Sequence, residues 1–328
     1  LDFATPGDHK PQRMQQYLDT IDKFNACGSF VTLPGYELSF GCGHMNFYYR
    51  NREAESKFPE AWMKVATHPD FYKPDRARIE GFYDFWEPEE VIMIPHHMNM
   101  TSGTVEKVVH EDGYALWRQS DWRSVDDRYV KLAEMSQGRG SFETEEINED
   151  WRVLYGGYGS SVRSALARDL RFGFISGTDN HDGWPSRGQR SALGLAVVQA
   201  PELTREAIFD AMRARRTYAT TGARIGLDFV LNGKYPMGSE AKLYPIEKRT
   251  FRISIQGTAP IERVEIISSG TKLDSIPVNG TNELDVEWTD PRLDPPVDNC
   301  YYYLRVRQED GNLAWASPIW VDYRDKSD

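Results

Sequence analysis

The stretch Glu90-Val91-Ile92-Met93-Ile94-Pro95-His96-His97 joins a short apolar run to two adjacent histidines. A run of this length and composition predicts a strand buried on both faces. In parallel α/β folds, ligands bind at the carboxyl ends of such strands. Two imidazoles at the end of a buried strand therefore indicate a functional site at that edge of the sheet.

Four further places put a carboxylate or an imidazole at the end of a predicted strand or inside one. They are Asp8-His9 after residues 1–5, Glu37 after 31–33, Glu134 within 130–135, and Asp179-Asn180-His181 after 172–176. Taken alone, an Asp-His pair is more often a capped turn. Together, the five places favour a metal site, because mixed imidazole and carboxylate ligands suit Zn, Mn or Fe better than Ca or Mg.

Three of the histidines leave alternatives open. Adjacent residues on a strand point in opposite directions, so we expect only one of His96 and His97 to bind a metal directly. His44 lies between a glycine and a predicted strand, where packing and metal ligation fit equally well.

The sequence pattern differs between the first and the last part of the chain. Residues 1–222 alternate apolar runs with helical segments at 11–24, 160–169 and 204–216, the last with Thr204 as its N-cap. This alternation predicts a largely parallel α/β sheet, open or closed into a barrel. Residues 223–328 instead carry short strands between turns, which predicts an antiparallel β-sandwich. These strands are expected at 226–231, 250–256, 261–267, 284–288, 300–307 and 319–323.

Other segments have simpler interpretations. Residues 58–90 and 101–128 are expected to be insertions or long loops over one end of the first domain, where such loops often carry function. The run Tyr301-Tyr302-Tyr303 is expected to alternate between the sandwich core and the surface.

Composition excludes several classes of protein. The 328 residues carry a formal net charge of −11, which disfavours binding to nucleic-acid backbones. No apolar stretch is long enough to span a membrane. Residues 1–30 lack the pattern of a secretion signal, although a cleaved signal is compatible with a chain that does not begin with Met. We therefore expect a soluble protein, cytoplasmic or periplasmic.

Several motifs of other protein classes do not occur in the sequence. The three cysteines, Cys27, Cys42 and Cys300, form neither a disulfide framework nor a zinc-ribbon pattern. The chain has no Gly-x-Ser-x-Gly elbow, no phosphate-binding loop of the Walker type and no dinucleotide fingerprint. All seven histidines fall within residues 1–181, so the chemistry is expected in the first domain.

Several of these segments resemble the polymerase and histidinol phosphatase (PHP) superfamily of metal-dependent phosphoesterases. Thr5-Pro6-Gly7-Asp8-His9 resembles its Thr-Asp-His motif, and Gly177-Thr178-Asp179-Asn180-His181 resembles its final Ser-Asp-x-His motif. More specifically, the chain resembles a PHP-related family of unknown function, domain-of-unknown-function family 3604. The segments that carry this second resemblance are 34–37, 43–46, 94–97, 205–211, 217–222 and 314–320.

The resemblance implies a distorted (β/α) barrel that holds two or three metal ions at the ends of its strands. Under it, Glu37 bridges two metals, His96 binds one of them and Asp179 the other. His9 and His181 hold the third metal. The substrate side is then lined by His44, His97 and Asn180.

Two departures from the PHP pattern reduce this ligand set. We expect the sequence to start after the His-x-His strand that opens PHP barrels, because no His-x-His occurs within it; whether that strand precedes Leu1 in the natural gene stays open. The pattern also expects a histidine where Met135-Ser136-Gln137-Gly138-Arg139 stands, so Gln137 or Glu134 would have to substitute. We therefore expect an incomplete PHP-like barrel, residues 1–222, followed by a sandwich, residues 223–328.

The function that the resemblance implies is metal-dependent hydrolysis of a small anionic ester, with a phosphate ester as the expected substrate and one to three divalent ions. A non-phosphate ester substrate on the same metal site is one alternative. A non-catalytic module that binds carbohydrate or protein is the other. The oligomeric state stays open.

Overall fold

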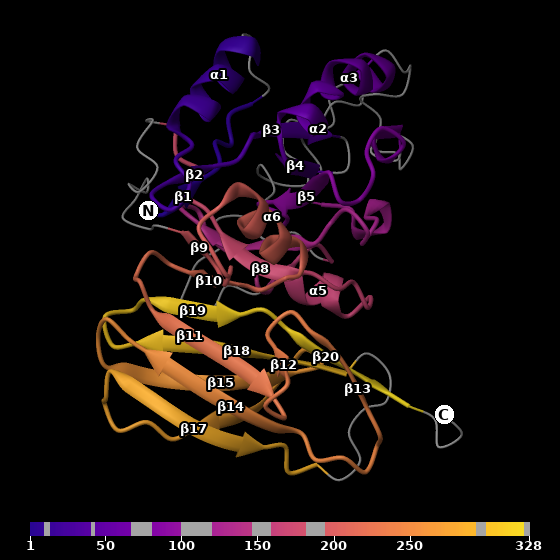
Figure 1. Cartoon of the computed structure of the whole chain (residues 1–328). Helices are drawn as coiled ribbons and strands as arrows, with labels where there is room; N and C mark the ends of the chain where they lie inside the picture. The colour runs from indigo at the N-terminus through magenta and orange to yellow at the C-terminus, as the bar shows by residue number, and fades with distance from the viewer. Residues whose placement is uncertain are drawn as a thin grey trace, which may run out of the picture.

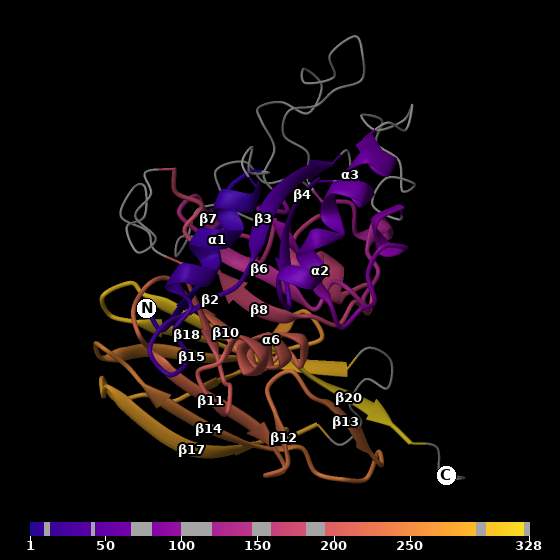
Figure 2. The ribbon, with the colours of Figure 1, turned by 45° about the horizontal axis from the view of Figure 1, so that its top comes forward.

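The computed structural model describes residues 1–9, 14–40, 43–66, 81–99, 120–145, 159–181, 194–292 and 300–324. The chain forms a mixed α/β part followed by a β-sandwich (Figure 1). Figures 1 and 2 both place helices α1 (Met14–Phe24) and α3 (Phe58–Ala66) at the end of the molecule away from strand β17 (Glu283–Thr289).

Small open sheets make up the first part of the chain. Strands β1 (Phe3–Ala4) and β2 (Val31–Thr32) pair in parallel. Strands β3 (Gly35–Phe40), β4 (Gly43–Tyr49) and β5 (Val91–His96) form an antiparallel sheet, with helix α2 (Arg52–Ser56) after β4. A further sheet combines β6 (Leu132–Gln137), β7 (Gly140–Ser141) and β8 (Gly173–Ser176). Between β5 and β6 lies the short helix η1 (Trp122–Ser124), and α5 (Val162–Leu166) precedes β8.

The expectation of a largely parallel sheet is wrong for these residues. The structure shows open sheets and no closed barrel among the described residues. The reason is local: only positions 41 and 42 separate β3 from β4, and so short a connection joins antiparallel strands. The parallel pairs that remain here are β1–β2 and β6–β8.

Two sheets form the sandwich. The smaller one contains β11 (Gly226–Leu231), β12 (Tyr235–Pro236), β14 (Thr250–Gln256) and β17. The larger one contains β13 (Glu240–Leu243), β15 (Ile261–Ser268), β16 (Thr271–Ile276), β18 (Cys300–Gln308), β19 (Leu313–Ala316) and β20 (Ile319–Tyr323). Their facing side chains form one apolar core. The six predicted strands are confirmed as β11, β14, β15, β17, β18 and β20. Strands β12, β13, β16 and β19 were not predicted, and β13 pairs with β20 in parallel, unlike the expected antiparallel pattern.

The larger sheet continues across position 222. Strand β10 (Thr217–Thr220) pairs with β19 on one side and with β9 (Leu195–Val198) on the other. Helix α6 (Arg205–Arg213) connects β9 to β10, and Thr204 caps it by accepting from the N–H of Ala207. The predicted N-cap is therefore confirmed.

Tyr301, Tyr302 and Tyr303 are all buried, so the expectation that the run alternates between core and surface is wrong. Tyr302 points into the sandwich core. Tyr301 and Tyr303 point into a second core, where they pack with apolar side chains of the first part of the chain. The face expected to meet water is covered by the rest of the chain.

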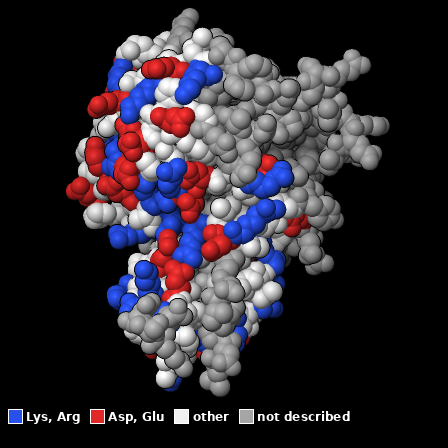
Figure 3. Space-filling model, turned by 90° about the vertical axis from the view of Figure 1, so that its right-hand side faces the viewer, with Lys and Arg blue, Asp and Glu red and all other residues white. Residues whose placement is uncertain are grey.

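Charged groups also join the two parts. Arg171, before β8, contacts Asp322 at 2.7 Å and Glu240 at 3.0 Å. On the face shown in Figure 3, Lys and Arg side chains interleave with Asp and Glu side chains. No described helix combines the length and the apolar character that a membrane crossing requires.

Candidate metal centre

The antiparallel sheet β3–β4–β5 brings three site residues onto one face. His44 on β4 lies opposite His96 on β5, and Glu37 on β3 lies opposite Asn46, two residues along β4 from His44. Side chains two residues apart on a strand share a face. The pairing register therefore places Glu37, His44 and His96 together, although 59 positions separate the first from the last.

The carboxylate of Glu37 is the centre of this group. Its Oε1 lies 2.5 Å from Nδ1 of His44, and its Oε2 lies 3.7 Å from Nε2 of His96 and 4.0 Å from Nε2 of His9. Burial alone would raise the pKa of Glu37, but the hydrogen bond from His44 and the charge on His96 outweigh it and lower that pKa to about 2. Glu37 is therefore an ionised, buried carboxylate.

Glu37, His96 and His97 form a group of three that could hold a metal ion. One ligand atom from each lies within 4.8 Å of the other two, and all three residues are buried. Two imidazoles and one carboxylate make a donor set that suits Zn, Mn or Fe. We call this group the Glu37 trio.

His96 and His97 do not point in opposite directions, contrary to the strand-based expectation. Their ring centroids lie 4.2 Å apart. Strand β5 ends at His96, and His97 has a φ of 33°, in the left-handed region that side chains rarely adopt. This turn of the backbone breaks the alternation, and such outliers often occur at functional sites.

Burial sets the charge state of His97. It holds the pKa of His97 well below its usual value, and His96, His44 and Arg139 add to this effect. His96 behaves in the opposite way: burial lowers its pKa, but the carboxylates of Glu134 and Glu37 raise it overall. The two neighbouring imidazoles therefore differ in their affinity for a proton.

Asp179 lies at the edge of the Glu37 trio. Its Oδ2 is 3.5 Å from Nε2 of His96. The same oxygen accepts a hydrogen bond from Nε2 of Gln137 at 2.5 Å and pairs with the guanidinium of Arg139. The amide nitrogen of Gln137 thus bonds to Asp179, and its Oε1, the atom that could bind a metal, accepts the backbone N–H of Arg139. Sequence reasoning missed Arg139 as a site residue, although it falls in the segment where the PHP pattern expects a histidine.

The remaining predicted residues are more exposed to solvent than the trio. His9 is 62% exposed at its side chain, His181 is exposed and Asn180 is half-buried. Neither His9 nor His181 belongs to the trio found among the described residues. Their role as ligands of a third metal stays a prediction.

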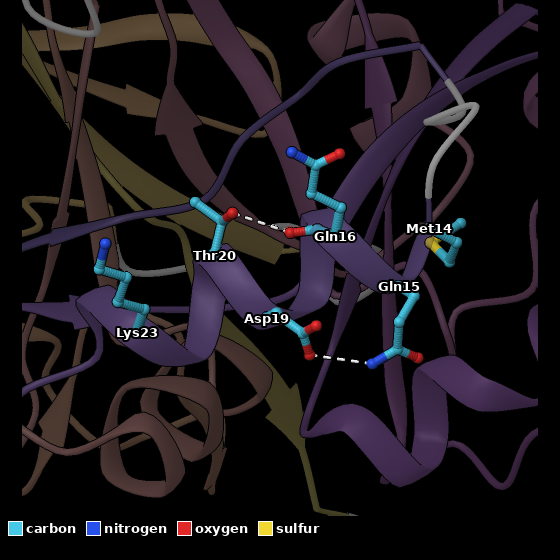
Figure 4. Close-up of a pocket in the computed structure, with 6 residues that line it drawn as sticks. All are labelled: Met14, Gln15, Gln16, Asp19, Thr20 and Lys23. Atoms are coloured by element: carbon cyan, nitrogen blue, oxygen red, sulfur yellow. Dashed lines mark hydrogen bonds between the residues drawn. The ribbon is translucent and has the colours of Figure 1, made fainter.

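A pocket of the molecule lies elsewhere. It is lined by Met14, Gln15, Gln16, Asp19, Thr20 and Lys23, all from helix α1 (Figure 4). Gln15 donates to Asp19 at 2.9 Å, and Thr20 donates to the carbonyl of Gln16 at 2.8 Å. None of the six belongs to the trio, so this helix face is not the candidate site.

Comparisons with protein families and with known proteins found matches for this chain. Residues 186–240 match the family described as "Protein of unknown function (DUF3604)", which confirms the resemblance to that family for this segment. An uncharacterized protein of Chlamydia trachomatis is 37% identical over 342 residues, covering 95% of this chain and 50% of that protein. An uncharacterized protein of Chlamydia muridarum is 32% identical over 337 residues, again covering 95% and 50%. The chain spans about half the length of these curated relatives.

Among solved structures, a two-domain protein from Bacteroides vulgatus that contains a predicted PHP-like metal-dependent phosphoesterase is 12% identical to this chain. The similarity covers 97% of this chain and 86% of that one, with a TM-score of 0.38.

Proposed function

We propose that this protein is a metal-dependent hydrolase of a small phosphate ester. The observation that carries the proposal is the buried Glu37 trio, whose ligand atoms from two strands and one turn lie within 4.8 Å of one another. A divalent cation bound there would lower the pKa of a water toward neutrality and would offset charge on a phosphoryl oxygen.

The surrounding residues support such a site in two ways. Glu134 accepts the backbone N–H of His97 at 2.9 Å and so fixes the turn that places this imidazole. His44 and Glu37 form a close pair, in which the hydrogen bond from Nδ1 of His44 to Oε1 helps to keep this carboxylate of the trio ionised and fixes its orientation. Because all these groups are buried, their electrostatic interactions are stronger than they would be in water.

The test begins with metal analysis of the protein purified without chelator, followed by assays with phosphate, sulfate and carboxylic esters. We expect bound Zn, Mn or Fe and hydrolysis of phosphate esters that a chelator abolishes and added metal restores. Glu37→Gln should reduce the activity by at least about 100-fold, because it removes the charged member of the trio. The matched control is Glu60→Gln, at an exposed carboxylate on helix α3.

Two results would overturn the proposal. A chain that holds no metal after purification and after incubation with Zn or Mn contradicts the metal site. Hydrolysis restricted to sulfate or carboxylic esters contradicts the phosphate substrate and favours a different ester on the same residues.

A further inference from the structure

A cation supplied by the chain itself lies beside the Glu37 trio. The guanidinium of Arg139 pairs with Oδ2 of Asp179, the carboxylate oxygen that is 3.5 Å from Nε2 of His96. The Asp179 side chain is only 7% exposed. The carboxylate that the PHP resemblance assigns to a second metal is therefore already matched by a positive charge.

The side chain of Gln137 holds Arg139 next to Asp179. Oε1 of Gln137 accepts the backbone N–H of Arg139 at 2.5 Å, while Nε2 of Gln137 donates to Asp179 at 2.5 Å. One amide side chain thus links both members of the ion pair. The segments themselves are joined as well, since the N–H of Gly138 donates to the carbonyl of Thr178 at 3.3 Å.

Arginine suits this position chemically. Its guanidinium stays charged at any pH at which the protein is folded, and its fixed donors match a carboxylate. A divalent ion at the same oxygen would have to lie next to this charge in a buried site, where repulsion between cations is strong. The carboxylate of Asp179 can therefore pair with the guanidinium of Arg139 or bind a divalent ion, but not both.

We propose that Arg139 takes the place of the second metal ion, the one that the PHP resemblance puts at Asp179, so that a single divalent ion lies between Glu37 and Asp179, held by Glu37, His96 and His97. This inference rests on the proposed function only in taking the trio as a cation site. It departs from the two or three ions that the PHP resemblance implies, and it gives Arg139 the role of a permanent positive charge in the centre.

The number of bound ions tests the proposal. The metal-free protein is titrated with Mn²⁺, with calorimetry for the stoichiometry and electron paramagnetic resonance for coupling between ions. We expect one Mn²⁺ per chain with the spectrum of an isolated ion. Arg139→Met removes the positive charge and leaves Asp179 with the hydrogen bond from Gln137, so this variant should bind two Mn²⁺ per chain. Adding Asp179→Asn should return the number to one.

Two further variants keep the result interpretable. Arg139→Lys keeps the positive charge and should bind one ion. Arg123→Met is the matched control, because Arg123 is an exposed arginine that pairs with Asp121 at 2.8 Å, and it should also bind one ion. Circular dichroism of each variant shows whether it is folded.

Two Mn²⁺ per chain in the unaltered protein, reduced to one by Asp179→Asn, overturn the proposal, whatever the folding of the other variants. A folded Arg139→Met protein that still binds one ion overturns it as well. These outcomes are separate from the fate of the proposed function. One ion without phosphate-ester hydrolysis contradicts only the function, whereas two ions with hydrolysis contradict only the role of Arg139.

Discussion

Glu134 lies directly behind His96, with its Oε2 2.9 Å from Nδ1 of that imidazole. Burial lowers the pKa of this imidazole, but the charge of Glu134 and a hydrogen bond to it raise that pKa overall. The contact leaves Nε2, the other ring nitrogen, facing the carboxylates of Glu37 and Asp179. Carboxylates placed in this way fix the orientation and raise the basicity of metal-binding histidines.

We therefore predict that Glu134→Gln weakens the affinity for Mn²⁺ or Zn²⁺ by about 10- to 100-fold without unfolding the protein. Calorimetric titration of the metal-free protein measures the change, and Glu60→Gln serves as the control. An unchanged dissociation constant in a folded Glu134→Gln protein would show that this carboxylate does not act through His96.

Glu143 joins the two parts of the chain. It is buried, and it accepts from Tyr303 at 2.7 Å and from Arg305 and Trp315 at 2.9 Å each. Glu143→Ala would leave these donors without their acceptor, so we predict a loss of about 3 kcal/mol in unfolding free energy. Urea unfolding measures it, with Glu309→Ala at an exposed position as the control. Equal midpoints for both variants would contradict this role.

Glu55 gives the stability of the protein a pH dependence. Burial raises the pKa of this carboxyl from 4.5 to about 7, against the opposing effects of Tyr36 and Arg52. Between these values the folded chain binds more protons than the unfolded chain. The contribution of Glu55 to unfolding free energy therefore falls as the pH rises from about 4.5 to about 7.

Glu55→Gln removes this ionisation, so above pH 7 we expect a variant about 2 kcal/mol more stable than the unaltered protein. Near pH 4 the two should be similar. Thermal or urea unfolding across this pH range measures the difference, and Glu53→Gln on the same helix is the control. A Glu55→Gln protein that keeps the full pH dependence would assign it to another group.

Gly194 allows a close approach between chain segments next to Asp179. A Cβ atom at this position would overlap the carbonyl oxygen of Gly177, just after strand β8. We predict that Gly194→Ala lowers the unfolding free energy by about 2 kcal/mol. Gly7→Ala, whose Cβ would meet Asn46 at an ordinary 3.8 Å, is the control. Equal stability of the two variants would show that the backbone adjusts without cost.

Local patterns in the sequence predict much of the sandwich. Strands β11, β14 and β20 have the predicted bounds, because their alternating or apolar runs are closed by turn residues. Strand β9 was not predicted. It has four half-buried residues, and its pairing depends on β10 and through it on the distant β19. Pairing between segments far apart in sequence overrides local preference.

The candidate site shows the same limit. Glu37 and His96 were visible in the sequence because each follows an apolar run. The role of His97 depends on its φ of 33°, and that of Arg139 depends on the approach of Asp179 from another strand. Neither conformation has a signature in the order of the amino acids. The sequence predicted which residue types lie at the strand ends. Which of these side chains contact one another depends on the pairing of strands in three dimensions.

The pairing of β10 with β19 has a consequence for inheritance and engineering. A chain cut after position 222 would expose hydrogen-bonding edges on both fragments, and exposed edges favour aggregation. The two parts are therefore not interchangeable modules that recombination could exchange singly. Gene fusion, truncation or domain swapping would have to carry residues 195–220 together with the sandwich.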